Sequence, residues 1–172
     1  MNFEIGALAI PGLAAFDLTQ EYQNIGPETM LRSVSGRAIK QMTYAKLRVV
    51  TSGSGWIPDG LQILDRSITH VVRCVKPRLV PAVFATRQAT LPAARRTDTG
   101  STPWGYARLP GGQTVSSAVS MAGDVATVSA VTDAVAYSVA YLPEITAFVM
   151  PPSESGDMGT ATYRWEIVAE EE

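Results

Sequence analysis

Short runs in which apolar and polar residues alternate recur along the whole chain, and few segments have the spacing of a helix. Residues 15–22 place Phe16, Leu18, Gln20 and Tyr22 on one face, which predicts a half-buried strand after a first apolar strand over 3–10. Residues 28–34 and 37–50, separated by Ser35-Gly36, predict a hairpin. A helix over 36–46 is the alternative, but the Thr, Tyr and Val residues beyond position 42 favour a strand.

The last third of the chain has the clearest strand pattern. Runs rich in Val, Ser, Ala and Thr cover 114–121, 125–131, 134–142 and 145–150, with turn residues between them. A final strand over 160–168 would place Tyr163, Trp165 and Ile167 on one face, after a linker or hairpin loop over 151–159. This spacing predicts a mainly β, antiparallel sandwich or barrel, and 172 residues suit a single domain.

The middle of the chain is predicted to be less regular. Residues 51–55 form a Gly/Ser break, 56–60 a tight turn, and 61–64 one short helical turn. Residues 86–113 carry Pro92, Pro103 and Pro110 together with Arg87, Arg95 and Arg96. A loop of this length is commonly functional, and we expect a long arm that becomes ordered against a neighbouring subunit.

Charge is spread unevenly although the net charge is only -2. Residues 32–96 hold twelve Lys and Arg against Asp59 and Asp65, while 151–172 hold six acids against Arg164. The simplest interpretation is solvated surface charge. The alternative is a polarised subunit whose basic face meets the acidic face of the next copy. The amino-terminal apolar run contains Glu4 and Pro11 and lacks a basic start, so we expect neither a signal peptide nor a membrane span, and a product made in the cytoplasm.

No candidate for catalysis or metal binding is complete. His70 and Cys74 share a strand face, but a zinc site needs three or four protein ligands, and the chain has no other His or Cys. Ser52 or Ser54 with His70 and Asp65 lacks the nucleophile-elbow motif, and the Gly-rich turns lack the spacing of a phosphate loop. We therefore expect no catalytic residue, metal or cofactor, and a protein that is not an enzyme.

Two binding hypotheses remain. The arginines of 86–96 with Trp104 and Tyr106 could contact nucleic acid, although the near-neutral chain argues against specific binding. Alternatively, Trp56, Trp104 and Trp165 could form a platform for sugar rings, which would make the chain a carbohydrate-binding accessory module used in receptor recognition.

Two segments resemble small structural proteins encoded among the tail genes of tailed bacteriophages. One is KQMTYAKLRVVTSGSGWIPDGLQILDRS, with its Gly-x-Gly-Trp-x-Pro-x-Gly-Leu core at 53–61. The other is the ending ITAFVMPPSESGDMGTATYRWEIVAEEE. Together they cover about a third of the chain.

This resemblance implies a virion protein of the tail, a ring-forming subunit of the tail tube or baseplate with a tail-tube-like β-sandwich or barrel. It implies contacts with copies of itself, in a hexameric ring, and with neighbouring tail and baseplate proteins. It implies no membrane partner. The residues we expect at subunit contacts are Trp56, Pro58, Leu61, Arg87, Arg95, Arg96 and Trp165.

Overall fold

The structure is a computed structural model that describes residues 2–157 and 159–172. It is mainly β, with antiparallel strand pairs, as predicted. Its one helix in the described residues is the short 3-10 helix η1 (Gly12–Ala14), whereas 61–64, predicted to be a helical turn, form bends and turns. The strands are β1 (Glu4–Ile5), β2 (Leu8–Ala9), β3 (Phe16–Ile25), β4 (Glu28–Arg32), β5 (Ala38–Met42), β6 (Lys46–Gly55), β7 (His70–Arg73), β8 (Arg78–Ala82), β9 (Gln88–Thr90), β10 (Trp104–Arg108), β11 (Thr114–Ser117), β12 (Val119–Ala122), β13 (Val125–Val128), β14 (Ala136–Tyr141), β15 (Glu144–Val149), β16 (Ser153–Asp157) and β17 (Thr162–Glu171).

The chain divides into two compact units, where the sequence predicted one domain over 1–172. Unit 1 comprises Met1–Glu4 and Arg73–Ile145, and unit 2 comprises Ile5–Val72 and Thr146–Glu172. The main part of unit 1 is inserted between two parts of unit 2. The boundary between the units is therefore not a linker whose composition would mark it in the sequence.

The centre of unit 2 is an antiparallel sheet in which β17 pairs with β6 from Tyr163↔Gly55 to Glu170↔Arg48, and β6 pairs with β3. Along β6 the side chains alternate, so that Leu47, Val49 and Thr51 are buried. The flexible break predicted over 51–55 is therefore wrong: these residues form the second half of β6. Likewise β16, in the predicted linker 151–159, pairs with β17. Along β6, Gly53 is buried against Trp165 while Ser52 and Ser54 lie on the opposite, partly exposed face, so the alternation of a strand is kept by Gly and Ser residues.

Two glycines of β6 allow close packing. A Cβ on Gly53 would lie 2.7 Å from the indole of Trp165, and one on Gly55 would lie 2.1 Å from the carbonyl oxygen of Leu13. Trp165 is 2% exposed, and its Nε1 donates a hydrogen bond of 2.6 Å to the carbonyl of Ala14. The Gly-x-Gly-Trp segment and the aromatic closing strand, far apart in sequence, are thus adjacent in the core of unit 2.

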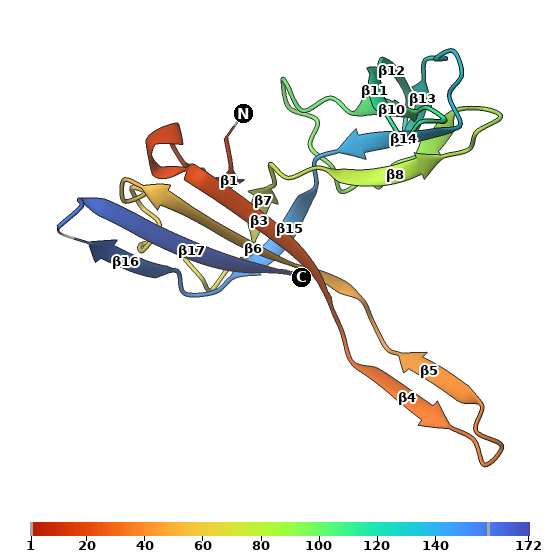
Figure 1. Cartoon of the computed structure of the whole chain (residues 1–172). Coiled ribbons are helices and arrows are strands. Elements are labelled where there is room, and N and C mark those ends of the chain that lie inside the picture. The colour runs from red at the N-terminus through yellow and green to blue at the C-terminus, as the bar shows by residue number, and fades with distance from the viewer. Residues whose placement is uncertain (1, 158) are drawn as a thin grey trace. The chain divides into compact units, whose positions relative to one another are not determined.

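The β3–β6 ribbon continues into a hairpin formed by β4 and β5 (Figure 1). The pairs run from Glu28↔Met42 to Arg32↔Ala38, which confirms the hairpin predicted from the sequence. Its turn is closed by Gly36, whose N–H donates to the carbonyl of Ser33 at 2.8 Å and whose φ is 79°. The returning segment 37–50 was predicted as one strand but is two, β5 and β6, separated by 43–45.

Unit 1 is a small two-layer β-sandwich. Its sheets have the strand orders β11-β10-β14-β8 and β12-β13-β9. Side chains from both sheets form one core, made of Ala89, Leu91, Ala107, Ala126, Val128, Tyr137, Val139 and Tyr141. This arrangement is the sandwich that the short, regularly spaced strands of the sequence predicted.

The expectation that 86–113 form a long arm is wrong for the described structure, because this segment contains β9 and β10 and is folded into unit 1. The three arginines between 86 and 96 have partners there. Arg87 donates to the carbonyl of Val128 at 3.2 Å, Arg95 pairs with Asp124 at 2.8 Å, and Arg96 pairs with Asp98. The prolines and arginines of this segment led to the prediction of a loop. The alternation of Ala89 and Leu91, which are core residues, indicated a strand instead.

Candidate functional site

The surface that stands out for assembly is the hairpin. Every residue from 26 to 45 is exposed, which leaves both faces of β4 and β5 in solvent. Large apolar side chains lie among them, and these are Met30, Leu31, Val34, Ile39, Met42 and Tyr44. An isolated two-stranded hairpin is marginally stable in water, and a cluster of exposed apolar side chains commonly marks an interaction surface.

The hairpin is also basic. Between Glu28 and Met42 it carries Arg32, Arg37 and Lys40 against the single acid Glu28, a net charge of +2. Lys40 forms an ion pair with Glu28 at 2.9 Å on one face. The charged side chains of β4 and β5 share one face with Met30 and Met42, while Leu31 and Ile39 lie on the other face. The hairpin therefore suits a partner that offers both acids and apolar surface.

The residues predicted at subunit contacts fall into three groups. Pro58, Leu61, Arg96 and Trp165 are buried within the chain, so their side chains are not available at its surface. Trp56 is 66% exposed, while Arg87 and Arg95 are partly buried and bonded inside unit 1. Of the seven, we retain Trp56 as a surface residue suited to a contact.

Arg96 has a structural role in unit 1. Its guanidinium donates to Asp98 at 2.7 and 2.8 Å and to the carbonyls of Asn2 and Cys74 at 3.0 and 3.2 Å. The hydrogen bonds from Arg96 hold the pKa of Asp98 well below its usual range. These four bonds join three separate chain segments, which explains why a charged side chain is buried here.

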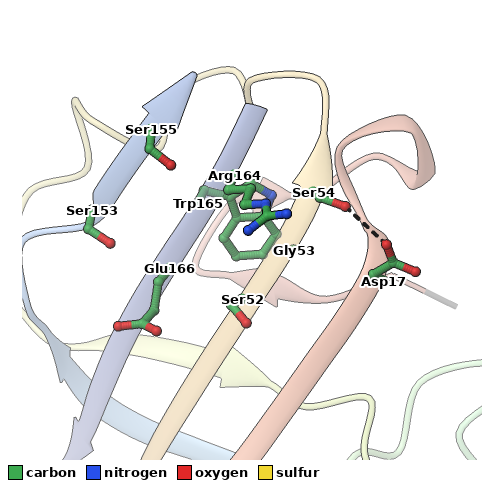
Figure 2. A pocket seen from close by; sticks show the side chains of 9 residues that line it. All are labelled: Asp17, Ser52, Gly53, Ser54, Ser153, Ser155, Arg164, Trp165 and Glu166. Atoms are coloured by element: carbon green, nitrogen blue, oxygen red, sulfur yellow. Dashed lines mark hydrogen bonds between the residues drawn. The ribbon is translucent and has the colours of Figure 1, made fainter. Parts of the chain in front are cut away.

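A polar pocket of about 360 Å³ opens on one face of the unit 2 sheet (Figure 2). Strand alternation places Arg164 and Glu166 on this face while Trp165 faces the core. The residues that line it are Asp17, Ser52, Gly53, Ser54, Ser153, Ser155, Arg164, Trp165 and Glu166. Ser54 and Asp17 point toward one another, and Ser54 Oγ donates to Asp17 Oδ2 at 3.4 Å and to the carbonyl of Phe16 at 3.0 Å. The pocket presents hydroxyls and charges of both signs.

The predicted catalytic and metal candidates are not assembled into a site. His70 contacts the backbone carbonyl of Asp65, and no hydrogen bond in the described part of the chain joins it to Ser54. The Asp65 carboxylate instead accepts from Ser67, which lowers its pKa. Cys74 is buried. Across 2–157 and 159–172, no three His, Cys, Asp or Glu side chains are grouped to hold a metal ion.

The hairpin was predicted as a hairpin but not as a candidate interface, and one signal could have identified it. In β4 and β5 apolar side chains lie on both faces, since Met30 shares one face with Lys40 and the paired Leu31 and Ile39 lie on the other. A hairpin with exposed apolar side chains on both faces has the pattern of an interaction surface.

No helix in the described residues is long and apolar enough to cross a membrane. Comparisons of the chain with protein-family models, with curated proteins and with solved structures gave no match.

Proposed function

We propose that the chain is a structural subunit of a tailed bacteriophage, in the tail tube or baseplate, that assembles into a ring with copies of itself. The observation that carries the proposal is the β4–β5 hairpin, with twenty consecutive exposed residues and six large apolar side chains. The resemblance of 53–61 and of the carboxyl-terminal segment to phage tail proteins supplies the virion context and a ring of six.

The partner of the hairpin is a second copy of this chain. The hairpin has a net charge of +2, whereas 151–172 carry six acids against Arg164. Complementary charge steers association and fixes register, and the apolar side chains contribute the burial. A head-to-tail contact between two different surfaces of one subunit generates a closed ring when the rotation closes.

The test is the mass of the purified chain in solution, measured by light scattering and followed by negative-stain imaging. The full chain should form rings at micromolar concentration. A variant in which 28–42 are replaced by a two-residue Asn-Gly turn should be a folded monomer. A full chain that stays monomeric, or rings formed by the hairpin-deleted variant, would contradict the proposal.

Point variants locate the contact more closely. Ile39→Asp should abolish ring formation, because an unpaired carboxylate would be buried at the contact. Ile63→Asp is the matched control, since Ile63 is 87% exposed and lies outside the hairpin. Arg32→Glu with Arg37→Glu should also prevent assembly, and Glu154→Arg with Asp157→Arg in the same chain should restore it. Equal loss with both isoleucine variants would show that assembly does not depend on the hairpin.

A further inference from the structure

The outward face of the four-stranded sheet in unit 1 forms a groove along its strand β14. Strand pairing sets β14 between β10 and β8, with Tyr106 opposite Ser138 and Ser138 opposite Pro81. Two residues along each strand, on the same face of the sheet, Trp104 is opposite Ala140, and Ala140 is opposite Leu79. Small side chains therefore form the floor, and large ones from the two flanking strands form the walls.

The groove has a volume of about 520 Å³, within the range of ligand-binding clefts. Its lining residues are Leu79, Pro81, Tyr106, Arg108, Thr114, Ala136, Tyr137 and Ser138. Leu79 is 61% exposed, although it lies in a strand whose other face packs on the core. The face is thus an open trough with apolar walls.

The chemistry of the lining combines a ring surface, hydroxyls and a cation. Trp104 Nε1 donates to the Tyr106 hydroxyl at 2.9 Å, which orients both rings on the wall. Thr114 and Ser138 supply hydroxyls, and Arg108 is the charged group in the lining, which includes no acid. Aromatic rings pack against the C–H face of a pyranose, hydroxyls bond to its hydroxyls, and a guanidinium pairs with a carboxylate.

We propose that this groove, on β8, β14 and β10 of unit 1, binds an anionic polysaccharide chain. One sugar ring stacks on Tyr106 between the walls, its carboxylate pairs with Arg108, and its hydroxyls bond to Ser138 and Thr114. The groove runs along a strand and is open, so it accommodates an internal stretch of a chain rather than an end. This function is separate from ring assembly and rests on different residues.

Two other polymers fit the groove less well. A peptide that adds as a strand needs a continuous edge of N–H groups, and β8, the edge strand on the Leu79 and Pro81 side of the groove, contains Pro81, which has none. Nucleic acid needs several cations along its backbone, whereas the lining supplies one.

The test uses the full chain and isothermal calorimetry with the hexasaccharides of polymannuronate and polygalacturonate. Cellohexaose and maltohexaose are the neutral probes, and an oligothymidylate and a proline-rich peptide are the competing polymers. At least one anionic hexasaccharide should bind more tightly than every other probe. Absence of anionic-sugar binding up to millimolar concentration, or tighter binding of a neutral sugar, the oligothymidylate or the peptide, would overturn the proposal.

Substitutions of groove residues locate the sugar-binding site. Tyr106→Ala should weaken binding of the anionic sugar about tenfold, the effect of losing one buried aromatic contact. Ser138→Trp should abolish binding because the indole fills the trough while Tyr106 stays in place. A Ser138→Trp variant that still folds and forms rings shows that binding is blocked and that the chain is not misfolded. Arg108→Gln should remove the preference for the anionic over the neutral sugar.

Matched controls come from unit 2. Trp56→Ala removes an exposed tryptophan, and Arg164→Gln removes a guanidinium from the polar pocket. Both should bind the sugar as the wild type does. Arg164→Gln and the unit 1 variants should also form rings, which keeps this result distinct from that of the assembly test. Binding that survives both Ser138→Trp and Tyr106→Ala, or that is lost with Trp56→Ala, would overturn the proposal.

Discussion

The β3–β6 pair and the β4–β5 pair are two halves of one ribbon, yet they differ in what surrounds them. In the first half, β6 also pairs with β17, and Leu47 and Val49 are buried against other side chains of unit 2. In the second half, Met30, Leu31 and Ile39 are between 51% and 60% exposed. Both halves have similar strand composition and antiparallel pairing.

The difference shows that strand pairing and side-chain burial are separate features of this ribbon. Hydrogen bonds between strands replace bonds to water, so their net contribution is small. Burial of apolar side chains contributes more to the free energy of folding, and only β3–β6 has such burial within the subunit. Matched substitutions in the two regions should therefore have unequal effects on the free energy of unfolding, measured by urea denaturation followed by far-UV circular dichroism.

Tryptophan provides the largest contrast. Trp165→Ala should destabilise the protein by about 3–5 kcal/mol, because it empties a buried site in contact with Gly53. Trp56→Ala, on an exposed side chain, should stay within about 0.5 kcal/mol of the wild type. Similar losses from both would mean that Trp165 is not a core residue.

Leucine gives the next contrast. Leu47→Ala in β6, where the side chain is 7% exposed, should cost about 2–3 kcal/mol. Leu31→Ala in β4 should cost less than about 0.5 kcal/mol in the isolated subunit. In assembled rings, the second change should cost more, and a thermal shift of rings against monomers measures the difference.

Glycine substitutions test the packing by adding a methyl group instead of removing a side chain. Gly53→Ala should destabilise by about 1–3 kcal/mol, because the added Cβ would be 2.7 Å from the Trp165 indole. Gly36→Ala strains a turn with φ of 79° but meets no atom within 4 Å. It should speed amide hydrogen exchange in β4 and β5 and leave the free energy of global unfolding unchanged. Hydrogen exchange of the two strands, compared with urea denaturation, measures both.

The smallest effect concerns the Lys40–Glu28 ion pair, whose side chains are both 54% exposed. Lys40→Ala should alter the free energy of unfolding by less than about 0.5 kcal/mol, as for other solvent-exposed pairs. It should nevertheless weaken ring assembly at low salt. An unchanged assembly midpoint would show that Lys40 does not contribute to charge steering.

Sequence patterns predicted several of the strands that have one buried face. Period-two alternation located β17 with Trp165 and Ile167 inside, and Ser35-Gly36 located the hairpin turn. The pattern misjudged 51–55 and 86–113, where Gly, Pro and Arg dominate the local composition. Gly53 lies in a strand because Trp165 needs its space, and the buried Arg96 donates to the carbonyls of Asn2 and Cys74. Such long-range partners are not visible in a local window of sequence.

The sequence predicts the candidate surfaces less well than it predicts the strands. Exposed and buried tryptophans look alike in the sequence, so Trp56 and Trp165 were grouped although one is 66% and the other 2% exposed. The groove in unit 1 depends on register, which brings Tyr106, Ser138 and Pro81 into one row. Residues far apart in the sequence become neighbours only once the pairing is known.

The guanidinium of Arg73 bonds to Glu4 at 2.8 Å and to Glu144 at 2.9 Å, and these three residues stand at or beside the points where the chain passes into or out of unit 1. The inserted segment therefore begins and ends at neighbouring positions. An insertion whose two ends lie next to each other can be replaced by another such segment without disturbing the strand order of the host sheet.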